Sequence, residues 1–145
     1  MPKDRRLSRT LHALIHMAER NEPLTSDTLA KSLKTHGPAI RRMMSGLRLA
    51  GIVSSSKGHG GGWVLERAPD QITLLQIYEA LGEPTLFAIG SAQDTPECLV
   101  EQAVDAHLTK AMERAAQVLR TELSHTSLAD IAIEFEAKLA EQAKN

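Results

Sequence analysis

The most informative segment of this 145-residue chain reads Leu47-Arg-Leu-Ala-Gly-Ile-Val-Ser-Ser-Ser-Lys-Gly-His-Gly-Gly-Gly-Trp-Val-Leu65. Its leucines are typical of the end of a helix, and Gly51 is the kind of residue at which a helix stops. Two short segments, residues 52–57 and 63–66, then flank five residues of which four are glycine. This pattern predicts a β-hairpin with a flexible, glycine-rich tip.

Helical periodicity precedes the hairpin. Apolar residues recur at three- and four-residue spacing over about residues 4–20, which predicts a helix with one apolar face. Thr25 or Ser26 can cap a short second helix, and Pro38 is well placed as the first residue of a third helix that ends at Gly51. Three helices followed by a hairpin is the element order of a winged helix-turn-helix.

Helices are also predicted after the hairpin. Thr73-Leu-Leu-Gln76 is a capping box and starts a helix that continues through Leu81. A loop of about a dozen residues follows, and Thr95-Pro96 opens a long helix to about Ser124. Ser127-Leu-Ala-Asp130 starts a final helix. The sequence therefore predicts a mainly α-helical fold with one small β-hairpin as a wing.

Composition excludes several classes of protein. The chain is 42% hydrophobic and 24% charged, which is usual for a globular domain and excludes a disordered chain. No apolar run approaches the roughly 20 residues of a membrane helix, and the polar N-terminal segment is not expected to be a signal peptide. The single cysteine, Cys98, excludes an intrachain disulfide framework and fits a reducing compartment. We therefore expect a cytoplasmic protein without membrane association.

Charge is distributed unevenly along the chain. Residues 1–67 hold 12 Lys and Arg against 5 Asp and Glu, whereas residues 68–145 hold 5 against 13. This asymmetry suggests that the N-terminal half faces a polyanion. Together with the predicted element order, it indicates double-stranded DNA as the partner. A chance drift of charge along solvated helix faces is the alternative explanation.

The predicted third helix has the polar face that a recognition helix needs. At about 100° per residue, its apolar residues fall on one side, and three arginines and a serine fall together on another. Arginine suits this role because its planar fork binds guanine or phosphate bidentately. Glycines let the hairpin tip approach a phosphate, and basic residues of the first helix could contact the flanking DNA backbone. The candidate DNA-contacting residues are Arg5, Arg9, His36, Arg41, Arg42, Ser45, Arg48, Lys57, His59 and Gly60.

Three segments carry a resemblance to a known family. Leu24-Thr-Ser-Asp-Thr-Leu-Ala30, the run from Leu47 to Leu65, and Ile72-Thr-Leu-Leu-Gln-Ile-Tyr-Glu-Ala-Leu-Gly82 are similar to the Rrf-type winged-helix transcriptional regulators, the group of IscR, NsrR and CymR. The resemblance implies a homodimer joined through the long helix, which binds a palindromic operator; we expect a repressor. The apolar stripe from Val100 to Leu123 fits a dimer seam, or else packs on the chain's own domain.

The resemblance also implies a division of the chain. Residues 1–82 correspond to the winged helix-turn-helix DNA-binding domain, residues 83–95 to a loop, and residues 96–145 to the dimerisation helix and a C-terminal helix. CymR-like members work with a partner protein, so an adaptor that binds a protein through its acidic half is the alternative function. Salt discriminates between the two, because DNA binding weakens steeply as ionic strength rises.

The sequence differs from the family in the cysteines that bind a sensory cluster. Cluster-binding members carry three cysteines in the loop and at the start of the long helix, whereas this chain has Cys98 alone. We therefore expect no iron–sulfur cluster and no other cofactor. Cys98, near the third position of the long helix, is a candidate redox sensor because a helix N-terminus lowers a thiol pKa. Its alternative role is to pack, half-buried, as a small apolar residue.

Histidines offer a metal-responsive alternative. His12 and His16 lie four residues apart on the first predicted helix, with Glu19 one turn further along, which is a metal-ligand spacing. With Cys98 and His107, some of them from a partner chain, they could form a mixed metal site. Helical histidines are more often boundary residues, so we predict no bound metal.

Two motifs resemble parts of enzymes. His59-Gly-Gly-Gly-Trp63 is similar to an oxyanion-hole loop, but no Gly-x-Ser-x-Gly nucleophile elbow accompanies it. Ser54-Ser-Ser-Lys57 matches Ser-x-x-Lys, but it lies in a predicted strand and lacks the companion motifs of that chemistry. We therefore predict no catalytic activity.

Overall fold

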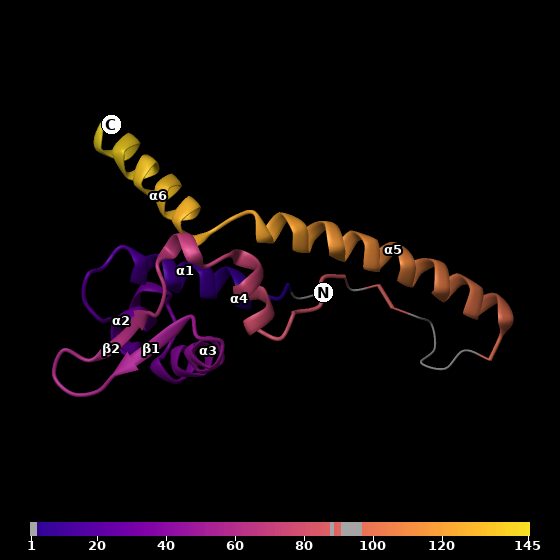
Figure 1. Ribbon diagram of the computed structural model, residues 1–145, viewed down its shortest axis with the longest axis horizontal. Helices are drawn as coiled ribbons and strands as arrows, with labels where there is room; N and C mark the ends of the chain where they lie inside the picture. The colour runs from indigo at the N-terminus through magenta and orange to yellow at the C-terminus, as the bar shows by residue number, and fades with distance from the viewer. Residues whose placement is uncertain (1–2, 88, 91–96) are drawn as a thin grey trace.

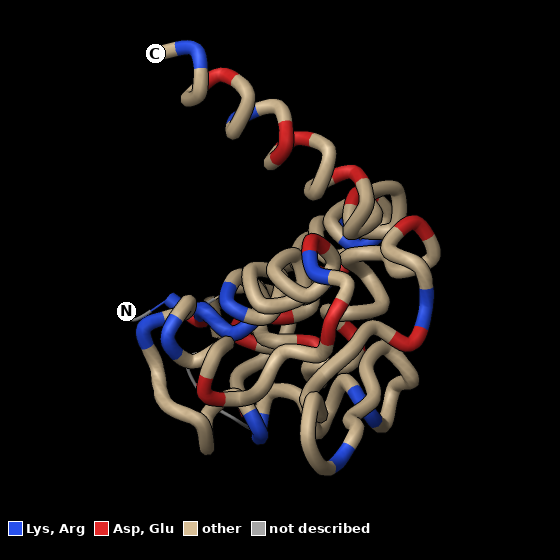
Figure 2. The backbone as a smooth tube through the Cα atoms, turned by 90° about the vertical axis from the view of Figure 1, so that its left-hand side faces the viewer, with Lys and Arg blue, Asp and Glu red and all other residues tan. Residues whose placement is uncertain are grey.

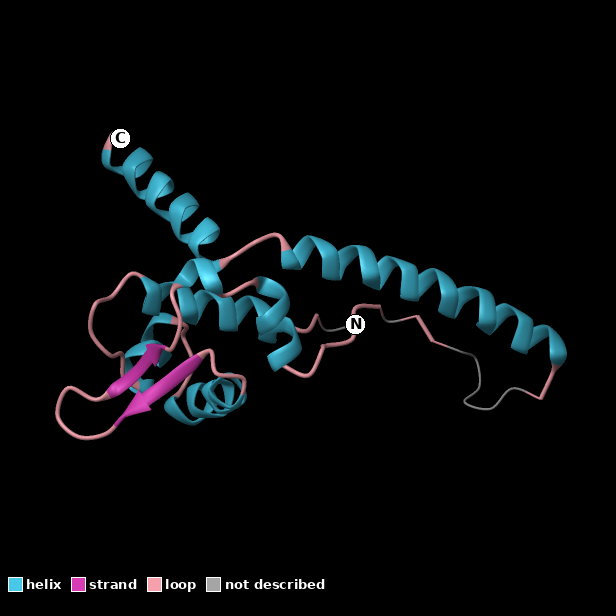
Figure 3. Cartoon of the chain, viewed as in Figure 1, coloured by secondary structure: helices cyan, strands magenta, loops and turns pink. Residues whose placement is uncertain are grey.

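The computed structural model describes residues 3–87, 89–90 and 97–145, and it shows a small helical domain from which two helices extend (Figure 1). Helices dominate, and two antiparallel strands pair as a hairpin (Figure 3). The predicted mainly α-helical fold with a β-hairpin wing is confirmed. The elements in chain order are α1 (Arg6–Ala18), α2 (Ser26–Ser32), α3 (Gly37–Leu49), β1 (Val53–Ser56), β2 (Gly62–Leu65), the 3-10 turn η1 (Pro69–Gln71), α4 (Leu74–Ala80), α5 (Leu99–Ser124) and α6 (Leu128–Ala143).

Side-chain caps set the starts of three helices. The Thr25 hydroxyl accepts a hydrogen bond from the backbone N–H of Thr28 (3.1 Å) and so caps α2. The capping boxes predicted at Thr73 and Ser127 are both present, and they start α4 and α6. Because these signals act within four residues, the sequence alone could place these helix starts.

The hairpin is held against the N-terminal helices. Strand β1 runs antiparallel to β2, with Val53 opposite Leu65. The Leu24 N–H donates to the Trp63 carbonyl (3.1 Å), and the Trp63 N–H donates to the Leu24 carbonyl (2.8 Å). The indole Nε1 of Trp63 also donates to the Ser26 hydroxyl (3.0 Å). The hairpin is therefore fixed to the segment that begins α2.

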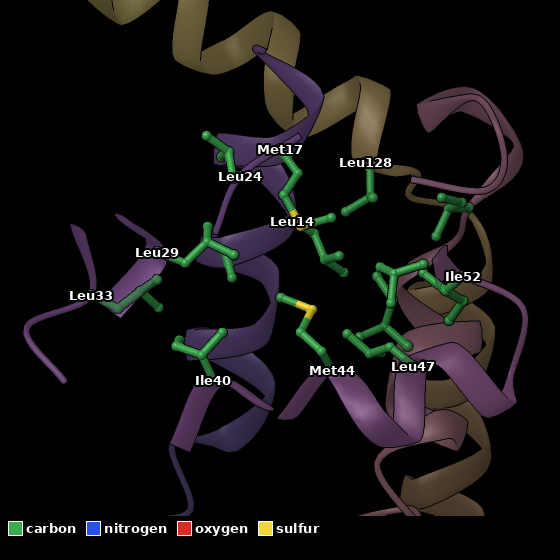
Figure 4. Packing of buried hydrophobic residues seen from close by; sticks show 14 of the residues in the cluster. Leu14, Met17, Leu24, Leu29, Leu33, Ile40, Met44, Leu47, Ile52 and Leu128 are labelled. Carbon is green, nitrogen blue, oxygen red and sulfur yellow. The ribbon is translucent and has the colours of Figure 1, made fainter. Parts of the chain in front are cut away.

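One buried cluster joins the N-terminal helices, the hairpin and α4 (Figure 4). Leu14 of α1, Leu29 of α2 and Leu47 of α3 are fully buried in it. Leu128, the first residue of α6, is also fully buried and reaches the same cluster. Its backbone N–H donates to the carbonyl of Ile72 (2.9 Å). The first turn of α6 therefore packs against the N-terminal domain, although the predicted division assigns it to residues 96–145. That division of the chain stays a prediction.

The long helix α5 differs from the others because none of its residues is buried. It extends away from the domain (Figure 1) and its main contact is with α4. There the Arg120 guanidinium donates to the carboxylates of Glu79 and Glu83 at 2.7 Å each. The expected helix start at Thr95-Pro96 lies outside the described residues, and the described helix begins at Leu99. In the described parts of the chain, no helix is long and apolar enough to cross a bilayer.

Candidate nucleic-acid interface

Helix α3 buries one face and exposes another. Ile40, Met44 and Leu47 are fully buried, and α3 packs closely on α2. The buried face matches the apolar stripe in the sequence, so the two faces separate as the helical periodicity predicts. The four polar residues predicted for the recognition face, Arg41, Arg42, Ser45 and Arg48, are all exposed.

The start of α3 is fixed by a cap and a close approach. His36, a predicted DNA contact, is the N-cap, and its Nδ1 accepts a hydrogen bond from the Ala39 N–H (3.4 Å). A Cβ at Gly37 would lie 2.9 Å from Oδ1 of Asp27 and 3.2 Å from Nη1 of Arg41. Glycine at residue 37 therefore allows α2 and the first turn of α3 to approach closely. His36 itself stays exposed beside the recognition face.

The wing tip, residues 57–61, is the second exposed feature. Lys57, His59 and Gly60 are all exposed. Gly58 and Gly60 adopt φ angles of 90° and 74°, and a Cβ at either position would meet no neighbouring atom. The left-handed backbone, rather than lack of space, therefore favours glycine at these two positions. The tip can offer backbone N–H groups and the Lys57 ammonium to a phosphate.

The start of α1 adds cations beside α3. Arg5 directly precedes α1, Arg9 lies one turn into it, and both are exposed. Arg6 is partly neutralised, since its Nη2 lies 2.7 Å from the Asp4 carboxylate, and hydrogen bonds from Arg6 hold the pKa of Asp4 below its usual value. Arg9 and Arg42 line one pocket between α1 and α3. Cations of the two helices therefore face a shared space.

Among the described residues, none forms an ion pair with the predicted DNA-contacting cations. In the ranges that the structure describes, Arg6, Arg120 and Lys138 are the cations that pair with carboxylates. Figure 2 shows Lys and Arg positions at the N-terminal segment and around the small domain. Cations without internal partners are available to displace counterions from DNA phosphates. The predicted contacts in this state are Arg5, Arg9, Arg41, Arg42, Arg48 and Lys57.

The two histidines of α1 form a close pair. Their Nε2 atoms lie 3.0 Å apart, and the rings of His12 and His16 stack with centroids separated by 4.8 Å. Burial lowers the pKa of His16, and the charges of His12 and Arg20 lower it further. Within residues 3–87, 89–90 and 97–145, no three His, Cys, Asp or Glu side chains gather to hold a metal ion. The described chain thus pairs His12 with His16 but adds neither His107 nor Cys98 to them.

Cys98 is the N-cap of α5, so its expected place at the third helical position is wrong. Its backbone is extended (φ −73°, ψ 128°) because the helix begins one residue later, at Leu99. The side chain is exposed, and the expectation of a half-buried apolar role does not hold in the single chain. The backbone N–H groups of Glu101 and Val100 lower the pKa of the thiol. An exposed thiol with a lowered pKa is chemically suited to oxidation.

A pocket between α1, α3 and α4 was not predicted from the sequence. Its volume is about 380 Å³, and Arg9, Thr10 and Arg42 are among its lining residues. Thr10 is fully buried on the core-facing side of α1, and in the described part of the chain its hydroxyl has no hydrogen-bond partner. The one signal of this pocket in the sequence is a threonine on an otherwise apolar face of α1. Helical periodicity cannot show that this threonine lies beside residues of α3 and α4.

Comparisons with known proteins agree with this geometry. A family model described as "Rrf2: Iron-dependent Transcriptional regulator" matches residues 4–134. YwnA of Bacillus subtilis, named as an HTH-type transcriptional regulator, is 30% identical over 127 residues, which cover 87% of this chain and 93% of that protein. A crystal structure described as a DNA-binding protein is 29% identical, with a TM-score of 0.71, and covers 87% of this chain and 97% of its own. CymR, the global cysteine regulator of B. subtilis, has the same fold at 24% identity, with a TM-score of 0.64 and coverage of 92% and 98%.

Proposed function

Because this chain belongs to the Rrf2 family of DNA-binding transcriptional regulators, we propose that it represses transcription as a homodimer bound to a palindromic operator. The observation that carries the proposal is the exposed polar face of α3, with Arg41, Arg42, Ser45 and Arg48 opposite the core. A two-fold dimer presents this face twice, at half-sites about one helical turn of DNA apart.

The polar face of α3 and the wing tip have different roles in DNA recognition. Helix α3 enters the major groove, where Arg41 and Arg48 can each bind a guanine edge bidentately. The wing tip, through Lys57 and His59, contacts phosphates and positions the domain without reading sequence. Arg5 extends the positive surface toward the flanking DNA backbone. The absence of ion pairs to these cations within the described ranges supports this division, because none of the described carboxylates has to be released before DNA binds.

Exposed apolar side chains on α5 support the homodimer. Leu99, Val100, Val104 and Leu108 keep 78%, 70%, 51% and 41% of their surface exposed, and together they line an apolar hollow. Val100, Val104 and Leu108 follow one another at four-residue spacing, so they form a continuous side of the helix. A contiguous exposed apolar surface of this kind marks a protein interface. We propose that a second copy of α5 covers it.

The residues present do not fit an iron–sulfur cluster held by three cysteines of one chain. A cluster held by three thiolates needs three cysteines, and the sequence contains one. We therefore propose a regulator without a cluster, in which Cys98 is the candidate redox-responsive thiol. Its exposure and lowered pKa support this assignment. A cytoplasmic location and the lack of catalytic activity are further parts of the proposal, and both follow from the role of the family.

A binding titration tests the proposal. Fluorescently labelled DNA from upstream of the protein's own gene is titrated at two salt concentrations, with random DNA as competitor. Arg41→Ala is expected to weaken specific binding by about 1–3 kcal/mol, while Lys144→Ala, a cation exposed at the far end of α6, leaves it unchanged. Equal affinity for specific and random DNA, with little dependence on salt, would favour a protein-binding adaptor instead.

A further inference from the structure

The pocket between α1, α3 and α4 has a size suited to a small molecule. Its volume of about 380 Å³ lies near the lower end of the roughly 300–1,000 Å³ range of ligand sites. Arg9 and Arg42 lie on its exposed side, and Ala39, Met43 and Leu81 give it an apolar wall. A few convergent polar groups over an apolar wall is the usual make-up of a ligand site.

The buried hydroxyl of Thr10 is the feature that points to a ligand. Thr10 lines this pocket, it is 0% exposed, and its Oγ1 has no hydrogen-bond partner among the residues that the structure describes. Buried polar groups without a partner are rare in folded proteins, and each one calls for an explanation such as a bound water or ligand. Valine has nearly the same shape and would fill this helical position without an unsatisfied group. The Thr10 hydroxyl therefore has a free hydrogen bond to offer to a water molecule or to a ligand oxygen.

The charged side chains of the pocket indicate the charge of that partner. Neither Arg9 nor Arg42 forms an ion pair within the parts of the chain that the structure describes. No carboxylate is among the residues that line the pocket. Arg6 also lines the pocket, but its guanidinium is paired with the Asp4 carboxylate at 2.7 Å. Arg9 and Arg42 therefore remain to match a carboxylate or phosphate group, which each guanidinium can bind through two hydrogen bonds.

We propose that this pocket binds a small organic anion. The charged group of the ligand pairs with Arg9 and Arg42, its apolar body packs on Ala39, Met43 and Leu81, and one of its oxygen atoms accepts a hydrogen bond from Thr10. The flexible arginine and methionine side chains move to let that oxygen reach the hydroxyl. A backbone phosphate of duplex DNA fits less well, because it is fixed to the duplex, whereas a free small anion can pass the moved side chains and reach the fully buried hydroxyl.

Occupancy of the pocket regulates DNA binding, a step that rests on the proposed function. Arg42 belongs both to the pocket and to the exposed polar face of α3. An anion that holds Arg42 in the pocket removes one cation from the DNA-contacting face and neutralises another, Arg9. The bound ligand therefore weakens DNA binding, and it does so most at low salt, where the electrostatic part of the affinity is largest.

Calorimetric titration of the full chain without DNA tests the site. Phenyl phosphate and benzoate are the probes, inorganic phosphate tests the need for an apolar body, and benzyl alcohol is the uncharged control. We expect wild type to bind at least one of the two aromatic anions at millimolar concentration or tighter, and benzyl alcohol much more weakly. Preference for phenyl phosphate would assign a phosphate ligand, and preference for benzoate a carboxylate.

Matched variants locate the binding. Arg9→Gln removes a charge, and Ala39→Leu fills the pocket while it keeps every arginine; each is expected to weaken anion binding roughly tenfold or more. Thr10→Val is expected to weaken it several-fold and to raise the melting temperature of the free protein. Arg48→Gln, on α3 but outside the pocket, is the control and leaves anion binding unchanged.

The outcomes separate this inference from the proposed function. If no aromatic anion binds wild type, or if binding survives both Arg9→Gln and Ala39→Leu, the site is refuted even when operator DNA binds normally. If anions bind as expected and DNA does not, the site stands and the proposed function fails. If anions bind and leave DNA affinity unchanged, the regulatory step is refuted. If inorganic phosphate binds as well as phenyl phosphate, the ligand needs no apolar body and the assignment of an organic anion is wrong. If benzyl alcohol binds as well, the assignment of an anion is wrong.

Discussion

Replacement of Gly62 by alanine is expected to detach the wing from the N-terminal helices. Gly62 has a φ angle of 151°, and a Cβ there would lie 2.7 Å from the carbonyl carbon and oxygen of Leu24. Both contacts are with backbone, so relief requires the hairpin to move. That movement breaks the two backbone hydrogen bonds between Leu24 and Trp63 and the bond from the indole to Ser26. Backbone strain and the loss of these bonds together are expected to cost about 2–4 kcal/mol.

Tryptophan fluorescence measures this effect directly, because Trp63 is the single tryptophan of the chain and lies in β2. Gly60→Ala is the matched control, since Gly60 also has a positive φ angle but its Cβ would meet no neighbour, and strain alone costs about 1–2 kcal/mol. In Gly62→Ala, the fluorescence of Trp63 should show exposure to solvent at a lower urea concentration than the one at which circular dichroism shows the helices unfolding. The reasoning is refuted if Gly62→Ala and Gly60→Ala show the same fluorescence midpoint.

Three further predictions concern charge, pH and assembly. Lys57→Ala should weaken binding to all DNA sequences alike and reduce the salt slope of the affinity by about one, as measured by anisotropy titration. The pKa of His16 is lowered by burial, so the unfolded chain takes up the proton first. Stability should therefore fall as pH drops below the ordinary value of 6.5, and urea midpoints should show a flatter pH profile in His16→Gln. Val104→Glu places a charge in the apolar hollow of α5 and should convert the proposed dimer to monomers in sedimentation, without loss of helicity. A Val104→Glu protein that sediments as a dimer would show that α5 is not the interface.

The sequence predicted what depends on short spacing, and it failed where contacts join distant segments. The capping boxes at Thr73 and Ser127 and the glycine-rich hairpin tip act within a few residues, so they could be identified directly. The start of α5 was placed too early, because Thr95-Pro96 resembles a helix start and nothing local shows that Cys98 is still extended. The anchoring of the wing by Leu24 could not be predicted, because it depends on how two segments almost 40 residues apart meet in space.

The same limit applies to the candidate sites. Helical periodicity placed the four recognition residues on an exposed face of α3, because the buried stripe of one amphipathic helix determines what its other sides expose. The anion pocket needs Thr10 from α1, Arg42 from α3 and Leu81 after α4, and no spacing in the sequence relates these residues. Their juxtaposition follows from the packing of three helices around the core.

The pocket also lies between α3, the element proposed to contact DNA, and α4, which holds α5. One wall is formed by α3, and another is formed by Leu81 and its neighbour in α4. Helix α4 carries Glu79 and is followed by Glu83, the two carboxylates that hold Arg120 of α5 at 2.7 Å. In a dimer joined through α5, the distance between the two α3 helices depends on how each domain is fixed to α5. A ligand that changes the packing of α3 on α4 would therefore alter the spacing of the two recognition faces as well as the charge on each.

Arg120→Met tests this connection, because it removes the ion pairs of α5 with Glu79 and Glu83 and leaves the pocket intact. It should reduce the effect of phenyl phosphate on operator affinity and leave phenyl phosphate binding itself unchanged, and an undiminished effect would show that the ligand acts through Arg42 and Arg9 alone.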